Sequence, residues 1–398
     1  MSAEFTPTRT AALEQLARFV PHAGADYAKL RNFDLGPGRH LHVSTLSPYL
    51  RHRLITEEEV LQAVLARHSL SAAEKFVQEV FWRTYWKGWL EMRPGVWSDY
   101  LMDRSTAWNA VQTQSGLRAR WEEACEGRTG IDAFDAWAQE LVETGYLHNH
   151  ARMWFASIWI FTLRLPWALG ADFFLRHLLD GDAASNTLSW RWVAGLQTKG
   201  KTYLARPSNI AKYTDGRFEP HGLARDAVAL RGPDHPARQP LPLPEHVEPG
   251  LRTGLLITPD DLSPGFVADQ VRSVDAVAMT SHRAGMTHLS MSQRVLDWER
   301  AAMDDCAARW KDRLGQIAQV EDLAAWAEAE GLEQVVTPYA PVGVEAEALA
   351  RLNRSGVRVV RLRRDYDSAA WPHATHGFFR FKEKIPLLVG ALKGLKAA

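Results

Sequence analysis

The pattern of apolar and polar residues divides the chain into a helical first part and a second part of different character. Up to about residue 230, apolar residues recur at the three- and four-residue spacing of helices. The clearest predicted helices cover the run FVQEVFWRTYWKGWL, about 146–163, and the segment that leads into Asp180. Sequences of the capping-box type at 56–59 and 71–74 predict two helix starts. The first part is therefore expected to be all-helical.

Beyond residue 250, short apolar runs alternate with helical stretches. The apolar runs lie at 255–257, 276–279, 334–336 and 357–360. The helical stretches lie at about 290–312, 320–330 and 343–355. Strands that alternate with helices predict a parallel sheet covered by helices. The segment has no GxGxxG motif and no GxxxxGK followed by Ser or Thr, so a phosphate-binding loop of either type has no support.

A proline-rich segment separates the two parts. Residues 232–250 contain six prolines, and proline disfavours both helices and central strands. We therefore predict a helical domain over 1–231, an extended linker over 232–250 and an α/β domain over 251–398. The predicted fold class is a multi-domain protein, α followed by α/β.

Composition narrows the class of protein further. Lys+Arg and Asp+Glu both number 47 among 398 residues, and zero net charge argues against a strong non-specific nucleic-acid binder. Cys125 and Cys306 have neither disulfide-framework nor metal spacing, so no metal site is predicted. No run is apolar enough to span a membrane, and the N-terminus lacks a signal-peptide core. A cytoplasmic monomer is expected.

The most informative stretch is DGDAASNTLSWRW at 180–192. Two carboxylates, Asp180 and Asp182, flank a glycine after an apolar helix, and the amide Asn186 follows. Upstream, the stretch HNHARM contains Arg152, and a buried guanidinium needs a carboxylate partner. Polar groups at one edge and apolar walls elsewhere suit a bound isoalloxazine.

These segments resemble the photolyase/cryptochrome family over 27–213, and more weakly over 250–390. In that family the α/β antenna domain usually precedes the helical FAD-binding domain, whereas the order here is reversed. The resemblance therefore implies a circular permutation, with a Rossmann-like antenna domain last. It implies FAD as the cofactor and leaves the antenna chromophore unknown.

The resemblance also implies which residues bind the cofactor. Tyr27 matches the lead-in to the segment that wraps the FAD diphosphate, and 44–47 match that segment itself. A threonine is usual where Val43 stands, and a glycine is usual near Arg53. Arg152 would pair with Asp180 at the flavin edge, and Asn186 would face N5. The implied cofactor-binding residues are Tyr27, Ser44, Thr45, Leu46, Ser47, Glu79, Arg83, Asn149, Arg152, Asp180, Asp182 and Asn186.

A second implied set faces the substrate. Glu79, Trp82, Arg83 and Trp86 have the spacing of one helix face, and without the resemblance this face could equally be a salt-bridged surface stripe. The substrate-binding residues implied by the family are Glu79, Trp82, Asn149, Met153 and Trp192. The residues implied to carry electrons or to tune the flavin in catalysis are Trp190, Trp167, Trp108, Asn186 and Glu79.

The resemblance favours a lyase that uses blue light to repair cyclobutane pyrimidine dimers in DNA, by electron transfer from reduced FAD. The alternative is a cryptochrome-like photosensor or another flavoprotein that does not repair DNA. His150 and Ala205 stand where the family has arginines that grip DNA phosphates. We therefore expect the DNA partner to be bound better when it is single-stranded or locally open.

Overall fold

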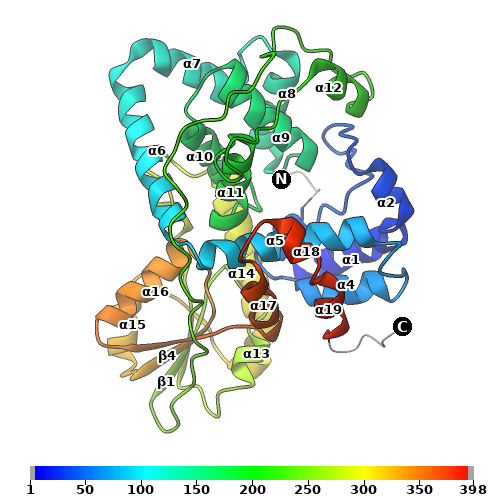
Figure 1. Cartoon of the computed structure of the whole chain (residues 1–398). Helices are drawn as coiled ribbons and strands as arrows, with labels where there is room; N and C mark the ends of the chain where they lie inside the picture. Colours follow the sequence, from blue (N-terminus) through cyan, green and yellow to red (C-terminus); the bar gives the residue numbers. More distant parts are fainter. Residues whose placement is uncertain (1–4, 393–398) are drawn as a thin grey trace.

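The computed structural model describes residues 5–392, and Figure 1 shows a helical part above and beside a smaller sheet-containing part. The helices of the first part are α1 Arg9–Phe19, α2 Ala25–Leu30, α3 Ser47–Arg51, α4 Glu57–Leu65, α5 Glu74–Glu91, α6 Gly95–Thr113, α7 Ser115–Cys125, α8 Asp132–Thr144, α9 Asn149–Ser157, α10 Trp167–His177, α11 Ala183–Val193 and α12 Pro207–Tyr213. A π-helical segment, Ile158–Thr162, continues α9.

The second part contains five parallel strands in the order β3-β2-β1-β4-β5. The strands are β1 Thr253–Ile257, β2 Ala276–Met279, β3 Ala318–Gln319, β4 Gln334–Pro338 and β5 Arg358–Leu362. The helices are α13 Gly265–Ala268, α14 Gln293–Leu314, α15 Leu323–Ala329, α16 Val344–Arg354, α17 Asp365–Ala370, α18 Phe378–Lys382 and α19 Ile385–Gly390. This order is that of a doubly wound α/β fold. The prediction of a helical part followed by a parallel α/β part is confirmed.

The two faces of the sheet have different neighbours. Leu256, Ala278 and Val335 pack against α15 and α16 in a separate small core. Leu255, Val277 and the residues that share their face belong instead to the large core, which continues through α14 into the helical part. Because neighbouring side chains of a strand alternate between faces, one sheet serves both cores. The α/β part is therefore packed directly onto the helices that carry the candidate site.

Helix α5 is the main contact between the two parts. Gly88 lies in this helix, and a Cβ atom there would come within 2.8–2.9 Å of Trp371. The absence of a side chain thus lets the segment after α17 approach the α5 backbone. Phe378 of α18 stacks on Trp82 of α5 with ring centroids 3.6 Å apart. The C-terminal helices α17–α19 therefore lie against the helical part (Figure 1).

The segment predicted as a linker has no regular secondary structure over 232–248, and it runs along both parts of the molecule (Figure 1). The Gln239 N–H donates to the Met92 carbonyl in the helical part at 2.8 Å. Glu245 accepts hydrogen bonds from the Arg361 side chain on β5 at 2.6 and 3.0 Å. The segment is therefore an extended tie between the two parts.

Three details of the predicted elements are wrong. Ser71 does not cap α5, because it bonds Ser69, whose hydroxyl accepts from the Ala72 N–H instead. The helix expected at about 146–163 begins only at Asn149, because Gly145 adopts a left-handed conformation that ends α8. Strand β3 was not predicted, because its two residues are both exposed. The capping box at Thr56 and Glu59 is confirmed.

Candidate functional site

The loop between α10 and α11 places Asp180 against Arg152 of α9. The two guanidinium nitrogens Nη1 and Nη2 lie 3.0 and 2.9 Å from the two carboxylate oxygens. Nε of Arg152 donates to the Leu147 carbonyl at 2.8 Å, which fixes the plane of the group. Burial alone would raise the pKa of Asp180, but Arg152 and Arg83 hold that pKa below its ordinary value. The predicted pair is therefore formed, with Asp180 ionised.

Asp182, two residues further on, caps helix α11. Its Oδ1 accepts a hydrogen bond from the Ser185 N–H at 2.8 Å, and its Oδ2 lies 2.6 Å from Nη1 of Arg83 on α5. A carboxylate is favoured at a helix N-terminus. Burial raises the pKa of Asp182, but Arg83, Lys87 and Arg51 lower it by more than burial raises it, so the net shift is downward. Two ionised carboxylates thus lie on one loop, each with a cationic partner.

Asn186 lies one turn into α11 and is held in one orientation. Its Nδ2 donates to the Ala171 carbonyl of α10 at 2.8 Å, and the residue is only 7% exposed. The carbonyl oxygen of the amide and its second N–H remain available for a ligand. Asn186 can therefore both donate to a flavin nitrogen and accept from one, without adding charge.

The segment 44–47 reaches the same loop from the other side. Thr45 has a left-handed backbone (φ 50°), and its hydroxyl accepts from Gln15 Nε2 and donates to the Ser44 carbonyl, each at 2.8 Å. Leu46 is buried at the start of the short helix α3. The Ser47 hydroxyl bonds to Asp180 and helps to lower its pKa. The segment expected at the diphosphate is therefore joined to the loop expected at the flavin ring.

The donor set fits FAD. It combines an ionised pair, a fixed amide, hydroxyl groups at a helix start and a guanidinium beside them. The buried Ser185 hydroxyl, in the first turn of α11, has no hydrogen-bond partner among residues 5–392. Buried polar groups are normally satisfied, so this unpaired donor next to the loop is consistent with a polar ligand.

The residues expected to face a substrate are less uniform. Glu79 forms an ion pair with Arg31, which also stacks over Tyr27 at 5.9 Å. Burial raises the pKa of Glu79, and Arg31 opposes this shift. One face of Trp82 is covered by Phe378. Glu79 thus has a protein partner and Trp82 offers only part of its ring.

The remaining expected residues lie on two other helices. Asn149 is exposed and Met153 half-buried on α9, and Trp192 is half-buried on α11. The Trp192 ring lies 5.9 Å from that of Tyr203. None of these side chains is sealed in the core, so each can meet a ligand.

The three tryptophans of the expected electron path lie in different surroundings. Trp190 is 2% exposed and packs edge-on against Trp159 and Phe174. A Cβ atom at Gly170 of α10 would come within 2.3 Å of the Trp190 ring, so only a glycine lets this indole pack there. Gly170 lies one helical turn after Trp167. Trp167 contacts Tyr100, and Trp108 contacts Trp121.

The two positions where the family has arginines for DNA phosphates are filled here by residues with structural contacts. His150 bonds the Asn32 carbonyl and the Tyr203 hydroxyl at 3.1 and 3.2 Å and stacks on Trp154. Burial lowers its pKa, so the ring is neutral near pH 7. Ala205 is 3% exposed. Neither position presents a cation to a phosphate.

The residues that support the backbone of the Asp180–Asp182 loop were not predicted from the sequence. Nε of Arg51 donates to the Gly181 carbonyl at 3.1 Å, and Nη1 of Arg51 lies 2.5 Å from Asp260 of the α/β part. Nη2 of Arg283, also in the α/β part, donates to the Leu178 carbonyl at 2.8 Å. All these groups are buried or nearly so. The only signal in the sequence was the basic run RHR at 51–53.

The crevice at the carboxyl ends of β1 and β4, where doubly wound folds usually bind ligands, is almost filled. A cavity of about 20 Å³ remains between Arg51, Lys87, Asp182, Asp260 and Glu345. Such a space holds about one water molecule. The helical part therefore closes the usual ligand crevice of this sheet.

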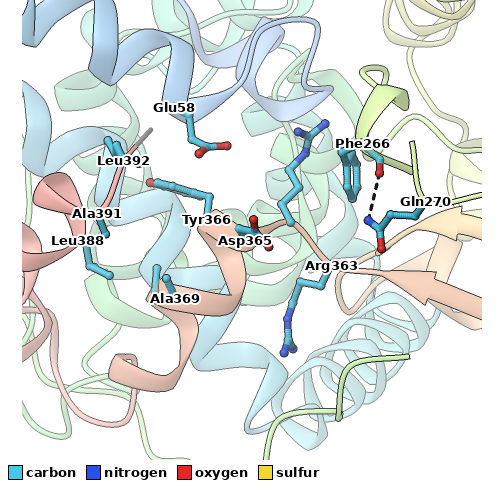
Figure 2. A pocket seen from close by; sticks show the side chains of 12 residues that line it. Glu58, Phe266, Gln270, Arg363, Asp365, Tyr366, Ala369, Leu388, Ala391 and Leu392 are labelled. Atoms are coloured by element: carbon cyan, nitrogen blue, oxygen red, sulfur yellow. Dashed lines mark hydrogen bonds between the residues drawn. The ribbon is translucent and has the colours of Figure 1, made fainter. Parts of the chain in front are cut away.

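A larger cavity of about 380 Å³ lies elsewhere, beyond the end of β5. Figure 2 shows Glu58 and Asp365 on its polar side and Leu388 and Leu392 on its apolar side. Arg364 also lines it and is already bound to both carboxylate oxygens of Asp261. None of the residues expected to bind FAD lines this cavity, so it is separate from the candidate site.

Other classes of site find no support within residues 5–392. No cluster of His, Cys, Asp and Glu there could hold a metal ion, and Cys125 and Cys306 are both free. Within the same residues, no helix is long and apolar enough to cross a membrane.

A comparison with known protein families finds that residues 76–222 match the family model described as the FAD binding domain of DNA photolyase. The chain is 32% identical over 219 residues to a deoxyribodipyrimidine photo-lyase of Synechococcus sp., covering 52% of this chain and 43% of that protein. It is 36% identical over 156 residues to a protein of the same name from Streptomyces griseus, covering 39% and 32%. The chain thus spans less than half the length of these relatives.

Among solved structures, a class III photolyase from Agrobacterium tumefaciens is 28% identical, with a TM-score of 0.44 over 54% of this chain and 44% of that one. A Synechocystis cryptochrome is 22% identical, with a TM-score of 0.42 over 52% and 43%. Both scores are below 0.5, so the family assignment depends on the sequence match.

Proposed function

We propose that this protein is a blue-light-driven lyase that repairs cyclobutane pyrimidine dimers in DNA. The match of residues 76–222 to the FAD binding domain of DNA photolyase supports this proposal. The observation that carries the proposal is the assembly of Arg152, Asp180, Asp182 and Asn186 around one loop. FAD, when bound and fully reduced, supplies the electron that splits the dimer and then takes that electron back.

The protein's share of the reaction is binding, orientation and electrostatic control. The ionised Asp180 and Asp182 accept hydrogen bonds from the polar edge of the flavin ring. Arg152 balances the charge of Asp180 and keeps it in place. Asn186 presents a neutral amide, which does not repel an anionic flavin as a carboxylate would.

The dimer would enter beside α5, α9 and α11. Glu79 would hydrogen-bond the dimer, while Trp82 and Trp192 stack on it and Asn149 and Met153 complete the wall. Glu79 would exchange its ion pair with Arg31 for a hydrogen bond to the dimer. Burial raises the pKa of Glu79 and Arg31 opposes this shift, so its carboxyl would be easier to protonate once Arg31 is displaced. A flipped base pair or an open strand brings the lesion to this depth.

We propose that the DNA partner is bound best when single-stranded, by a monomer. The neutral His150 and the buried Ala205 supply no phosphate contacts. Phosphate contacts provide much of the affinity for duplex DNA, whereas a lesion in single-stranded DNA needs no unpairing.

We propose further that the order of domains, 1–231 helical, 232–250 linker and 251–398 α/β, is a circular permutation of the family. Two observations support it: the helical part precedes the sheet, and the final helices pack on α5 through Phe378 and Phe381. In family members with the usual order, the α/β domain precedes the helical domain. If the permutation is right, that α/β domain should dock on the helix corresponding to α5, on the same face as it does here. An experimental structure with the sheet on another face would refute it.

Replacing Glu79 by alanine is expected to lower dimer repair by about 10- to 100-fold, because a hydrogen bond to a charged group contributes about 1.5–3 kcal/mol. Trp82→Ala should also lower repair, through the lost stacking surface. Repair per bound FAD is the measurement, with bound FAD read from absorption. Gln78→Ala, next to Glu79 on α5, is the matched control and should repair normally. Equal losses of repair and of FAD in the Glu79 variant would show a structural role only.

Replacing Trp190 by phenylalanine is expected to slow the blue-light reduction of oxidised FAD by an order of magnitude or more. Phenylalanine keeps the contacts with Phe174 and Trp159 but is far harder to oxidise than an indole. Photoreduction in the presence of a thiol donor is the measurement, and FAD content should not change. Wild-type kinetics in this variant would remove Trp190 from the electron path.

The second candidate function is a photosensor that binds FAD without repairing DNA. The stacking of Phe378 on Trp82 and the pairing of Arg31 with Glu79 favour it, because both substrate-facing groups already have protein partners. Photoreduction without repair would select this function.

A further inference from the structure

An aromatic line leads away from Trp167 along helix α6, in a direction that sequence analysis did not predict. The ring centroids of Trp167 and Tyr100 are 5.7 Å apart, and those of Tyr100 and Trp97 are 5.2 Å apart. All three rings are buried, at 7%, 0% and 3% exposure. The three rings therefore form a continuous packed path from the middle of the expected electron chain.

The path ends at the contact between the helical and α/β parts. Nε1 of Trp97 donates a hydrogen bond to Oε1 of Glu347 on α16 at 3.1 Å. Glu347 is exposed, so its carboxylate is in contact with solvent. The last ring of the line is thus buried, but its N–H is bonded to a group that can pass a proton to water.

Tyr100 offers no such outlet. Its hydroxyl is buried and has no hydrogen-bond acceptor among residues 5–392. The guanidinium of Arg104 lies 5.8 Å from the centre of its ring, and a fixed positive charge disfavours a second one nearby. An oxidised tyrosine would need to lose its phenolic proton at once. A positive charge is therefore more stable beyond Tyr100 than on it.

We propose that Trp97 is a further electron-transfer residue of this protein, and that Glu347 of the α/β part takes up its indole proton. FAD held by Arg152, Asp180 and Asn186 would serve, when illuminated in its oxidised form, as the electron acceptor, and Trp190 would supply the electron. Trp167 then reduces the oxidised Trp190, and Trp97 reduces the oxidised Trp167 across the Tyr100 ring. Oxidised Trp97 then loses its Nε1 proton to Glu347, leaving a neutral indolyl radical and a carboxylic acid. An external thiol returns one electron and one proton to Trp97.

This exit differs from the one expected at Trp108. Trp97 and Trp108 lie eleven residues apart on α6, which is about 16 Å along the helix. Trp108 contacts the ring of Trp121, whose Nε1 is buried without a partner. Trp97 has a carboxylate on its N–H, and proton loss traps the charge. The structure therefore gives Trp97 the more favourable end point.

The inference rests on the proposed flavin photochemistry, and the test separates the two. Purified FAD-loaded Trp97→Phe, Tyr100→Leu, Glu347→Gln and Trp108→Phe proteins are illuminated with blue light and a thiol donor. Trp97→Phe and Tyr100→Leu should slow photoreduction several-fold, and more than Trp108→Phe does. Glu347→Gln should replace the neutral radical by the radical cation in transient absorption. Denaturation curves confirm that each variant is folded.

A second readout does not depend on the rate of FAD reduction. Prolonged illumination in air without a donor should leave oxidation products on Trp97, mapped by peptide mass spectrometry, and none in a sample kept in the dark. Photoreduction at the wild-type rate in Trp97→Phe, with oxidation products on Trp108 alone, would overturn the inference. A wild-type protein whose FAD is not reduced by light would overturn this inference, whereas the proposed repair starts from fully reduced FAD and fails only if dimers stay intact in illuminated reduced protein.

Discussion

Replacing Arg53 by alanine is expected to lower the free energy of unfolding by about 3–5 kcal/mol, because the buried carboxylates of Glu57 and Asp367 lose the cation with which they form ion pairs. The Arg53 side chain, 4% exposed, lies 3.2 Å from Glu57, 3.3 Å from Asp261 and 2.6 Å from Asp367. Asp261 and Asp367 belong to the α/β part, so Arg53 connects the two parts. Urea denaturation at pH 7 measures the loss.

The backbone of Arg53 provides a matched comparison. Its φ of 48° is left-handed, a conformation that costs a non-glycine residue about 1–2 kcal/mol. Arg53→Gly loses the same ion pairs but relieves this strain, so it should be more stable than Arg53→Ala by about 1 kcal/mol. This account would be contradicted if the Arg53→Ala variant were as stable as the wild type, or if the Arg53→Gly variant were less stable than Arg53→Ala.

The loss at Arg53 should depend on pH. Burial raises the pKa of Asp367, and Arg53 opposes this shift, so removing Arg53 raises the pKa of Asp367 further. A carboxyl whose pKa is higher in the folded state favours folding only when protonated. The destabilisation of Arg53→Ala should therefore be largest at neutral pH and shrink as the pH falls toward about 4.

Replacing Arg152 by alanine is expected to weaken FAD binding by about 100-fold or more, because breaking a buried pair costs about 3–5 kcal/mol. Asp180, whose side chain is 2% exposed, would lose the cation that bonds both of its oxygens. Arg152→Lys keeps the charge but loses the bidentate geometry, so it should bind FAD with intermediate affinity. Equilibrium dialysis against free FAD gives the three affinities.

The same pair predicts the effect of acid. The pKa of Asp180 is lowered in the folded protein, so its contribution to stability is complete above about pH 4 and disappears as the pH falls below that value. Wild-type protein should therefore retain FAD to about pH 4. Without Arg152 the pKa of Asp180 rises, and release should begin at higher pH. Release at the same pH in both proteins would count against the assignment.

Local patterns in the sequence predicted the regular elements well where burial was strong. The continuous apolar runs at 255–257 and 334–336 became central parallel strands, since such strands are buried on both faces. Strand β3 was not predicted, because its two residues are exposed and carry no apolar pattern. The cap before α5 was predicted wrongly, because the Ala72 N–H donates to the Ser69 hydroxyl. The type and order of the helices and strands were thus more predictable than the residues at which they begin and end.

The site shows the same division. The Arg152–Asp180 pair was predicted from the resemblance to the photolyase/cryptochrome family, and it agrees with the need of a buried guanidinium for a carboxylate partner. The pairing of Glu79 with Arg31 and the support of Gly181 by Arg51 were not predicted. Both join residues at least 48 positions apart, and no periodicity in the sequence identifies such partners.

The most direct test of the proposed function is repair of a defined lesion. Fully reduced protein is mixed with an oligonucleotide that contains one cyclobutane pyrimidine dimer, as a single strand and as a duplex, and is illuminated with blue light or kept in the dark. We predict loss of the dimer only in the light, faster in the single strand than in the duplex. Dimers that remain intact in both substrates, in protein shown to carry reduced FAD, would contradict the repair function.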